Sequence, residues 1–279
     1  MTAPLPPLLL AVGLVAVALA TDQPLVVAAA CAGALLLHLA APPPRRLMLR
    51  VAVVSALFVL VLNPFVAVEG DHVLVAGPHF AVLDLEVTSE EVLYGAIAGM
   101  RLAVAILATS AFLRLADPDR TQALVSRIAP RSALTVALAA RLAPALRRDA
   151  NGLREALRLR GTAPGSGRRG ALRQSSRVVA PLVAASLERG VDISEAMVAR
   201  GYGAGAMTRL PEPPLAAPER IAVMAGAVTC AAAAALIAGV APYSVYPVAG
   251  PVAAAPGPVV AAVILAAGAV GARALGGRR

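Results

Sequence analysis

Six runs of apolar residues recur along the chain, each separated from the next by polar, glycine-rich or proline-rich sequence. A membrane-spanning helix needs about 20 consecutive, mostly apolar residues, so the pattern predicts six candidate spans, of which the first is short. The expected fold class is therefore all-α, in a polytopic membrane protein. The expected spans are Leu5 to Ala20, Pro24 to Ala41, Leu49 to Val68, Val92 to Leu115, Ile221 to Val240 and Gly257 to Leu275.

The long segment between the fourth and fifth runs follows a different pattern. Its apolar residues recur at helical spacing, and prolines and glycines mark the ends of three helices. These helices are expected over Asp119 to Ile128, Ser132 to Arg160 and Ala171 to Arg200. The apolar stripe of the second helix is Leu138, Leu142, Leu146, Leu153 and Leu157. The apolar contacts expected from the third helix are Val179, Leu182, Leu187, Ile193 and Met197.

These patterns divide the chain into three parts: an N-terminal bundle of four spans (residues 1–115), an inserted helical segment (116–219) and C-terminal spans (220–279). Charge predicts their orientation. The connection from Glu69 to Glu91 contains six acids and no arginine, whereas Arg114 to Arg220 contains 18 arginines against nine acids. Because loops rich in basic residues stay in the cytoplasm, the inserted segment and both chain termini are expected on the cytoplasmic side.

Composition narrows the possible chemistry. Of the 279 residues, 59% are hydrophobic and 15% charged, and all 25 basic residues are arginine. A nucleotide-binding P-loop needs a lysine, so the energy for any active process is expected from a partner. Cys31 and Cys230 lie in apolar runs and imply no disulfide framework. All sixteen acids lie outside the apolar runs, which disfavours a membrane-embedded enzyme, and no cofactor is expected.

The acidic connection after the third run is more than a bare loop. Val73 to Val75 and Phe80 to Val87 flank Gly77-Pro78, which predicts a short hairpin or a re-entrant piece. Thr88 to Glu91 has the Thr-x-x-Glu form of a capping box that opens the fourth span. His72 and His79 also lie in this connection, but their spacing fits no standard metal-ligand motif. We therefore expect no metal site.

Two of the expected helices end in the same dipeptide, Arg160-Gly161 and Arg200-Gly201. Glycine is favoured just past a helix C-terminus because it can adopt a positive φ, so each arginine is expected in a last helical turn at an exposed tip. A guanidinium offers a planar fork of donors to a carboxylate, which suits docking onto an acidic groove. Arginine near a helix C-terminus also complements the macrodipole, and the residues alone leave both interpretations open.

Arg101 lies about half-way along the fourth apolar run. An ionisable residue at that depth usually faces protein or water, so we expect an internal structural role within the bundle. Because no acid lies inside an apolar run, Asn63 is the nearest candidate partner.

The stretch Glu195 to Tyr202 (EAMVARGY) closely resembles the second Ala-Arg-Gly signature of the transmembrane (T) components of energy-coupling factor (ECF) transporters, the EcfT/CbiQ family. The stretch Glu155 to Gly161 is similar to the first signature, with Leu159 where the family usually has alanine. Val178 to Leu187 and Thr88 to Arg101 also resemble segments of the family. The resemblance is sharpest at the second signature.

The resemblance implies a non-catalytic scaffold of an ABC-type importer for vitamins, cobalt or nickel, in a bacterial inner (plasma) membrane. Such a scaffold is an L-shaped or splayed bundle that docks on two cytoplasmic ABC ATPase subunits. It also holds a small membrane-embedded S component that binds the substrate. Carried over to this sequence, the ATPase-docking residues are Arg160, Gly161, Ala199, Arg200 and Gly201.

Three other functions compete with this interpretation. A conventional ABC permease subunit also docks on ATPases, and Glu195-Ala196 fits the start of its signature, but the downstream Ile-x-Leu-Pro is missing. A membrane-embedded hydrolase or lipid transferase would need histidines or acids clustered at membrane level, and this sequence has no acid inside its apolar runs. The arginine surplus raises nucleic acid as a partner, but no aromatic residues are interleaved with it, so anionic lipid and acidic protein grooves are the expected partners.

Overall fold

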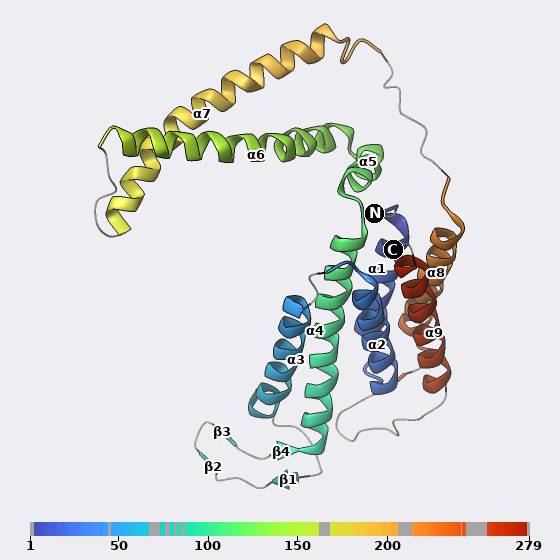
Figure 1. Ribbon diagram of the computed structural model, residues 1–279. Helices are drawn as coiled ribbons and strands as arrows, with labels where there is room; N and C mark the ends of the chain where they lie inside the picture. Colours follow the sequence, from blue (N-terminus) through green and yellow to red (C-terminus); the bar gives the residue numbers. More distant parts are fainter. Residues whose placement is uncertain are drawn as a thin grey trace. The chain divides into compact units, whose positions relative to one another are not determined.

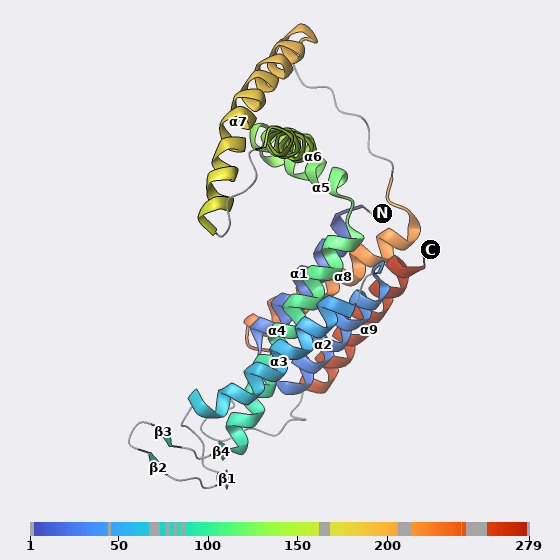
Figure 2. The same ribbon diagram turned by 60° about the vertical axis from the view of Figure 1, so that its left-hand side comes forward.

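The computed structural model describes residues 3–43, 46–66, 73–75, 79–80, 83–84, 87–161, 168–205, 214–240, 242–243 and 256–277. The chain forms two compact units, shown in Figure 1 and, from a second side, in Figure 2. The first, here the membrane unit, contains Met1–Thr121 and Pro214–Arg279. The second, here the helical segment, contains Gln122–Pro213.

Apolar helices build the membrane unit, and each lies where an apolar run predicts it. They are α1 (Leu5–Ala20), α2 (Pro24–Ala40), α3 (Arg46–Val66), α4 (Ser89–Leu115), α8 (Ala217–Ile237) and α9 (Gly257–Gly276). Among the described residues, α3, α4, α8 and α9 are long and apolar enough to cross a membrane, whereas α1 and α2 are shorter apolar helices. The prediction of an all-α polytopic membrane protein is confirmed.

Small residues bring these helices together in pairs. Helix α1 packs along α8, α2 along α9 and α3 along α4, and α4 also packs on α1 and α2. A Cβ atom added at Gly268 of α9 would lie 2.8 Å from the Cα of Gly33 in α2. A Cβ atom added at Gly99 of α4 would lie 2.6 Å from the carbonyl oxygen of Ala56 in α3. Because small residues let helix backbones approach closely in a membrane, these pairs depend on their glycines.

The main apolar core fills the space between α1, α2, α4, α8 and α9, separate from a small cluster of Val27 and Ile97. Its members that are at most 1% exposed include Leu10, Leu14, Val17, Val26, Leu37, Val104 and Ile264. Helix α3 lies at the edge of the unit, where it packs mainly on α4. Large apolar side chains of α3, such as Val54, Leu57 and Phe58, are more than half exposed, as expected for a surface that faces lipid.

Short strands precede α4. Strand β1 (Val73–Val75) pairs antiparallel with β4 (Val87–Thr88), and β2 (His79–Phe80) pairs antiparallel with β3 (Leu83–Asp84). The predicted hairpin is present, but Val73–Val75 does not pair with the residues directly after Gly77-Pro78. Gly77 and Pro78 themselves lie outside the described residues.

The predicted capping box at the start of α4 is confirmed. The Glu91 backbone N–H donates to Thr88 Oγ1 at 3.3 Å, and the Thr88 backbone N–H donates to Glu91 Oε2 at 3.0 Å. The two reciprocal bonds satisfy backbone donors that a helix N-terminus otherwise leaves unpaired. They set where the 27-residue α4 begins.

The helical segment follows α4 through α5 (Pro118–Ile128) and contains α6 (Pro130–Leu159) and α7 (Arg168–Ala199). All three predicted helices are confirmed, with ends that differ by at most three residues from those expected. Helices α5 and α6 each start on a proline, a residue whose fixed φ and missing N–H suit the first helical position. Within the segment, the long α6 and α7 cross each other.

Candidate functional site

The end of α6 has the geometry predicted from its Arg-Gly dipeptide. Arg160 is the C-cap residue, its backbone N–H donates to the Ala156 carbonyl oxygen at 3.1 Å, and Gly161 follows with φ +72°. The N–H of Gly161 donates to the Arg158 carbonyl oxygen at 3.0 Å. A residue with a Cβ atom rarely adopts that φ, so Gly161 lets the chain turn away and leaves Arg160 at the tip.

The end of α7 repeats this arrangement. Arg200 directly follows the last helical residue, Ala199, and Gly201 has φ +81°. The N–H of Gly201 donates to the Val198 carbonyl oxygen, and that of Tyr202 donates to the Met197 carbonyl oxygen, both at 2.9 Å. The bond from Tyr202 is the 6→1 bond of a Schellman motif. The predicted positive φ of both glycines is confirmed, and both arginines lie immediately after the last helical residue rather than within the last turn.

Both tips are exposed and combine a charge with apolar surface. Arg160, Gly161, Ala199, Arg200 and Gly201 are all exposed. Beside them, Leu159 is 85% exposed, Val198 70% and Tyr202 46%. Within the part of the chain that the structure describes, neither tip arginine takes part in an ion pair. Two donor forks, each next to an apolar side chain, are therefore available to partners.

One ion pair joins α6 to α7 among the described residues. Arg189 Nη2 of α7 lies 3.0 Å from Asp149 Oδ2 of α6. Ala150 and Val178 are buried in the same helices, at 9% and 3% exposure. The five predicted leucines of the α6 stripe are all half-buried. The prediction of which α7 residues make apolar contacts is partly wrong. Val179 and Leu187 are 53% and 68% exposed, and Val178 is buried instead.

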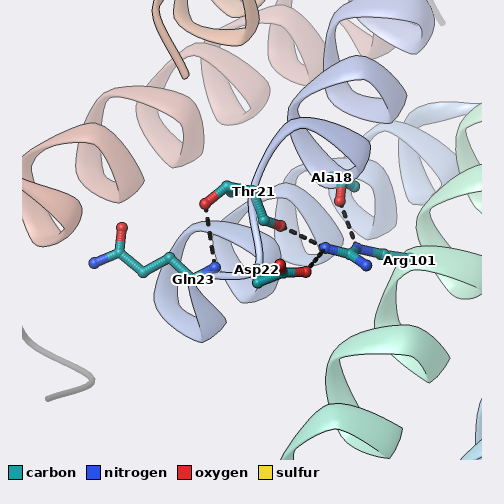
Figure 3. Close-up of polar contacts among 5 residues, drawn as sticks. All are labelled: Ala18, Thr21, Asp22, Gln23 and Arg101. Carbon is teal, nitrogen blue, oxygen red and sulfur yellow. Dashed lines mark hydrogen bonds and ion pairs between the residues drawn. The ribbon is translucent and has the colours of Figure 1, made fainter. Parts of the chain in front are cut away.

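Arg101 lies near the middle of α4 and reaches the turn between α1 and α2 (Figure 3). Its Nε donates to the Ala18 carbonyl oxygen at 2.8 Å, and its Nη2 donates to the Thr21 carbonyl oxygen at 2.7 Å. Nη2 also pairs with the Asp22 carboxylate. The last carbonyls of a helix have no partner within the helix, and unsatisfied ones are costly at membrane depth. Arg101 therefore satisfies the end of α1.

The prediction that Asn63 is the partner of Arg101 is wrong. Asn63 Nδ2 instead donates to the Glu91 carbonyl oxygen at 2.9 Å, and so joins α3 to the start of α4. The signal that could have revealed Asp22 is helix length. At 1.5 Å per residue, the 16-residue α1 spans about 24 Å and the 27-residue α4 about 40 Å. The α1–α2 turn therefore ends beside the middle of α4.

No metal-binding cluster of three histidine, cysteine or acidic residues occurs among the described residues. The backbone of His79 pairs with that of Asp84 in the β2–β3 ladder. His72 lies outside the described residues.

Comparison with known proteins adds one finding. The family model of the cobalt transport protein (CbiQ) matches residues 6–210, which include both helix tips and Arg101. No curated protein matches the chain. Since the match covers well over half of the 279 residues, the chain belongs to the CbiQ cobalt transport protein family.

Proposed function

We propose that the chain is the T component of an ECF-type importer, a non-catalytic scaffold between two cytoplasmic ABC ATPase subunits and a membrane-embedded S component. ATP hydrolysis occurs in the ATPase subunits, and the S component binds the cargo, a vitamin or a cobalt or nickel ion. The protein lies in a bacterial inner (plasma) membrane with both termini in the cytoplasm. It binds no nucleic acid.

The observation that carries the proposal is the pair of helix tips with the same geometry. Arg160-Gly161 and Arg200-Gly201 each put an exposed arginine at a helix end, followed by a glycine of positive φ. Two ATPase subunits of related structure would each present an acidic groove, and each groove would receive one tip. An arginine and a carboxylate make short, charge-assisted hydrogen bonds, often as a bidentate pair.

The apolar side chains beside the arginines support the same assignment. The binding energy of an interface is concentrated in charged or aromatic anchors that are surrounded by contacts excluding water. Leu159 at one tip and Val198 with Tyr202 at the other would provide that surrounding. An arginine that served only the membrane topology would need no such neighbours.

Transport coupling would use the length of α6 and α7. Movement of the ATPase subunits during ATP hydrolysis would displace the two tips and, through the 30-residue α6 and 32-residue α7, the rest of the helical segment. The half-buried leucine stripe of α6, together with exposed Val183 and Val191 of α7, offers apolar surface to the S component. The S component would reorient as this surface moves.

The deciding experiment is recovery of the tagged, full-length protein from its native membrane in mild detergent, followed by mass spectrometry of the proteins that copurify. We expect two ABC ATPase subunits and one small polytopic membrane protein, whose identity would name the cargo. Recovery without any ATPase, with nucleotide present, would contradict the scaffold role. The tips would then serve membrane topology and helix capping.

A further inference from the structure

The chain passes between the membrane unit and the helical segment at only two points, after Thr121 and before Pro214. The first crossing follows directly on α4, since α4 ends at Leu115 and α5 begins at Pro118. The joint between them is ordered on both sides. Ala116 N–H donates to the Phe112 carbonyl oxygen at 2.9 Å, and Asp119 N–H donates to Asp117 Oδ1 at 3.0 Å. Because only Ala116 and Asp117 separate the two helices, a displacement of α5 would act on the last turn of α4.

Arg114, in the last turn of α4, ties that turn to the end of α2. Its Nε donates to the Ser110 carbonyl oxygen at 3.0 Å, and its Nη1 donates to the Pro42 carbonyl oxygen at 3.3 Å. Its Nη2 lies 2.7 Å from Nδ1 and 3.2 Å from Nε2 of His38. The guanidinium therefore contacts α2 through a side chain and the loop after α2 through a carbonyl.

His38 is fully buried. Its Nδ1 lies 2.8 Å from Ser110 Oγ, which itself donates to the Leu107 carbonyl oxygen at 3.0 Å. A guanidinium can only donate hydrogen bonds, so one ring nitrogen of His38 accepts from Arg114 through its lone pair. A buried polar network of this kind fixes one geometry, because breaking one contact leaves the other groups unsatisfied.

This network adds a buried polar link to the direct packing of α4 on α2. Helix α2 packs along α9 over much of its length, with backbone contact at Gly33 and Gly268. A displacement of the last turn of α4 would therefore reach α2 through Arg114, and α9 through α2. At the second crossing, Glu219 in α8 accepts from the N–H groups of Ala216 at 3.0 Å and Ala3 at 3.2 Å, which links the start of α8 to the residues before α1.

We propose that Arg114 and His38 form a positioning clamp that passes movement of the helical segment into α2 of the membrane unit. This inference rests on the proposed function, because the ATPase subunits drive that movement. Neither residue touches cargo or nucleotide. They act by joining the helix that receives the movement to the helix pair that must follow it.

The test uses the assembled complex in nanodiscs and a single cysteine at position 39, in the Leu39→Cys variant. Leu39 is next to His38 and 42% exposed, and Cys31→Ala and Cys230→Ala remove the only other thiols of this chain, whose labelling is read separately from that of its partners after the subunits are resolved by electrophoresis. The measurement is the rate of maleimide labelling with and without ATP and vanadate, together with ATP hydrolysis and subunit composition. The matched control is Leu113→Ala, because Leu113 precedes Arg114 and is 71% exposed.

In the parent complex, which carries only Leu39→Cys, Cys31→Ala and Cys230→Ala, nucleotide should change the rate at which maleimide labels position 39. Arg114→Gln and His38→Ala should reduce that change by about fivefold or more, the lower end of ordinary coupling between sites, while the ATPase subunits still copurify and hydrolyse ATP. His38→Gln should retain part of the nucleotide-dependent change in labelling rate, because the side-chain oxygen of glutamine can accept a hydrogen bond from the Arg114 guanidinium. Leu113→Ala should behave like the parent. A role confined to stability would give no such rescue of the nucleotide response.

A parent-like nucleotide response in Arg114→Gln would overturn the clamp, because the movement would then reach α2 without it, through α8 or through the direct packing of α4 on α2. A parent complex that holds its ATPases but shows no response at position 39 would overturn it too. If Arg114→Gln does not assemble, Arg114→Lys decides: a single ammonium cannot reach all three acceptors of Arg114, so a parent-like response there contradicts the proposal. Absence of ATPases from the parent complex would instead contradict the proposed function.

Discussion

The membrane unit and the helical segment use their residues in opposite ways. In the membrane unit, fully buried side chains such as Leu10 and Ile264 come from helices far apart in the sequence. Among the described residues of the helical segment, only Ala133, Ala150 and Val178 are buried. The membrane unit therefore stabilises its own arrangement, whereas the helical segment leaves most of its described surface exposed.

The glycines show the same contrast at the level of single atoms. A Cβ atom at Gly99 or Gly268 would collide with the backbone of a neighbouring helix. At Gly152 of α6 and Gly190 of α7, an added Cβ atom would meet nothing within 4 Å. In the membrane unit, glycine is needed for packing between helices. Among the described residues of the helical segment, glycine is needed instead for the turns at Gly161, Gly201 and Gly203, where φ is positive.

The largest expected effect concerns the tips. Arg200→Glu should weaken binding of the ATPase subunits by about 2–5 kcal/mol, and by more than Arg200→Ala, because a second carboxylate adds repulsion to the lost donor fork. The same order is expected for Arg160. Affinity can be measured by biolayer interferometry with the purified chain. Because both tips are exposed, the thermal unfolding of the variants should match that of the parent.

Arg158→Glu is the matched control for Arg160→Glu. Arg158 is exposed and lies two residues away, on roughly the opposite side of the helix, so its reversal changes the net charge equally without touching the tip. If Arg158→Glu lowers the affinity as much as Arg160→Glu, the effect comes from overall charge. Equal losses from Arg200→Glu and Arg200→Ala would point to helix capping rather than contact with a carboxylate.

At Arg101 the expected effect is on the stability of the membrane unit, and there the backbone contacts and the ion pair can be separated. Arg101→Met removes the partner of two carbonyl groups, and each buried polar group left unsatisfied costs about 1–3 kcal/mol. Asp22→Asn should cost less than about 1 kcal/mol, because the Asp22 side chain is 42% exposed and the bonds to Ala18 and Thr21 remain.

Unfolding of both variants can be followed with a thiol-reactive fluorogenic dye. Cys31 and Cys230 are partly buried in α2 and α8, so the dye reports on the membrane unit. A larger loss from Asp22→Asn than from Arg101→Met would mean that the ion pair, rather than the capping of α1, holds the turn against α4.

Helix positions in both units follow from local sequence, which is why they could be predicted. Apolar runs, prolines at helix starts and glycines at helix ends act within a few residues, and α1 coincides with its predicted span. The capping box of Thr88 and Glu91 and the turns at Gly161 and Gly201 are equally local. These features needed no knowledge of neighbouring helices.

The errors concern contacts between elements that are distant in the sequence. Asp22 lies between two apolar runs, and its distance from Arg101 depends on the depth at which the hairpin of α1 and α2 ends. His38 lies 76 residues from Arg114, and no local pattern relates them. In α7, the choice between Val178 and Val179 depends on the direction from which α6 approaches. Helical spacing alone does not supply that direction.

The sharpest test substitutes alanine for one glycine in each unit. Gly268→Ala should destabilise the membrane unit by about 1–3 kcal/mol, because the added Cβ atom would press against the Gly33 backbone and separate α2 from α9. Gly152→Ala should stabilise α6 by about 0.5–1 kcal/mol, since alanine loses less backbone entropy in a helix than glycine does. The two substitutions add the same methyl group, so opposite signs would isolate packing as the cause.

The stability of Gly268→Ala can be measured with the thiol-reactive dye, and that of Gly152→Ala by amide hydrogen exchange over α6. Each variant is compared with the unsubstituted protein. Slower exchange in Gly152→Ala, with unchanged binding of the ATPase subunits, is the expected result. If Gly152→Ala instead strengthens α6 but weakens the binding of a partner, then the surface around Gly152 is itself a contact site. The helical segment would then hold its partners along the length of α6 as well as at its tip.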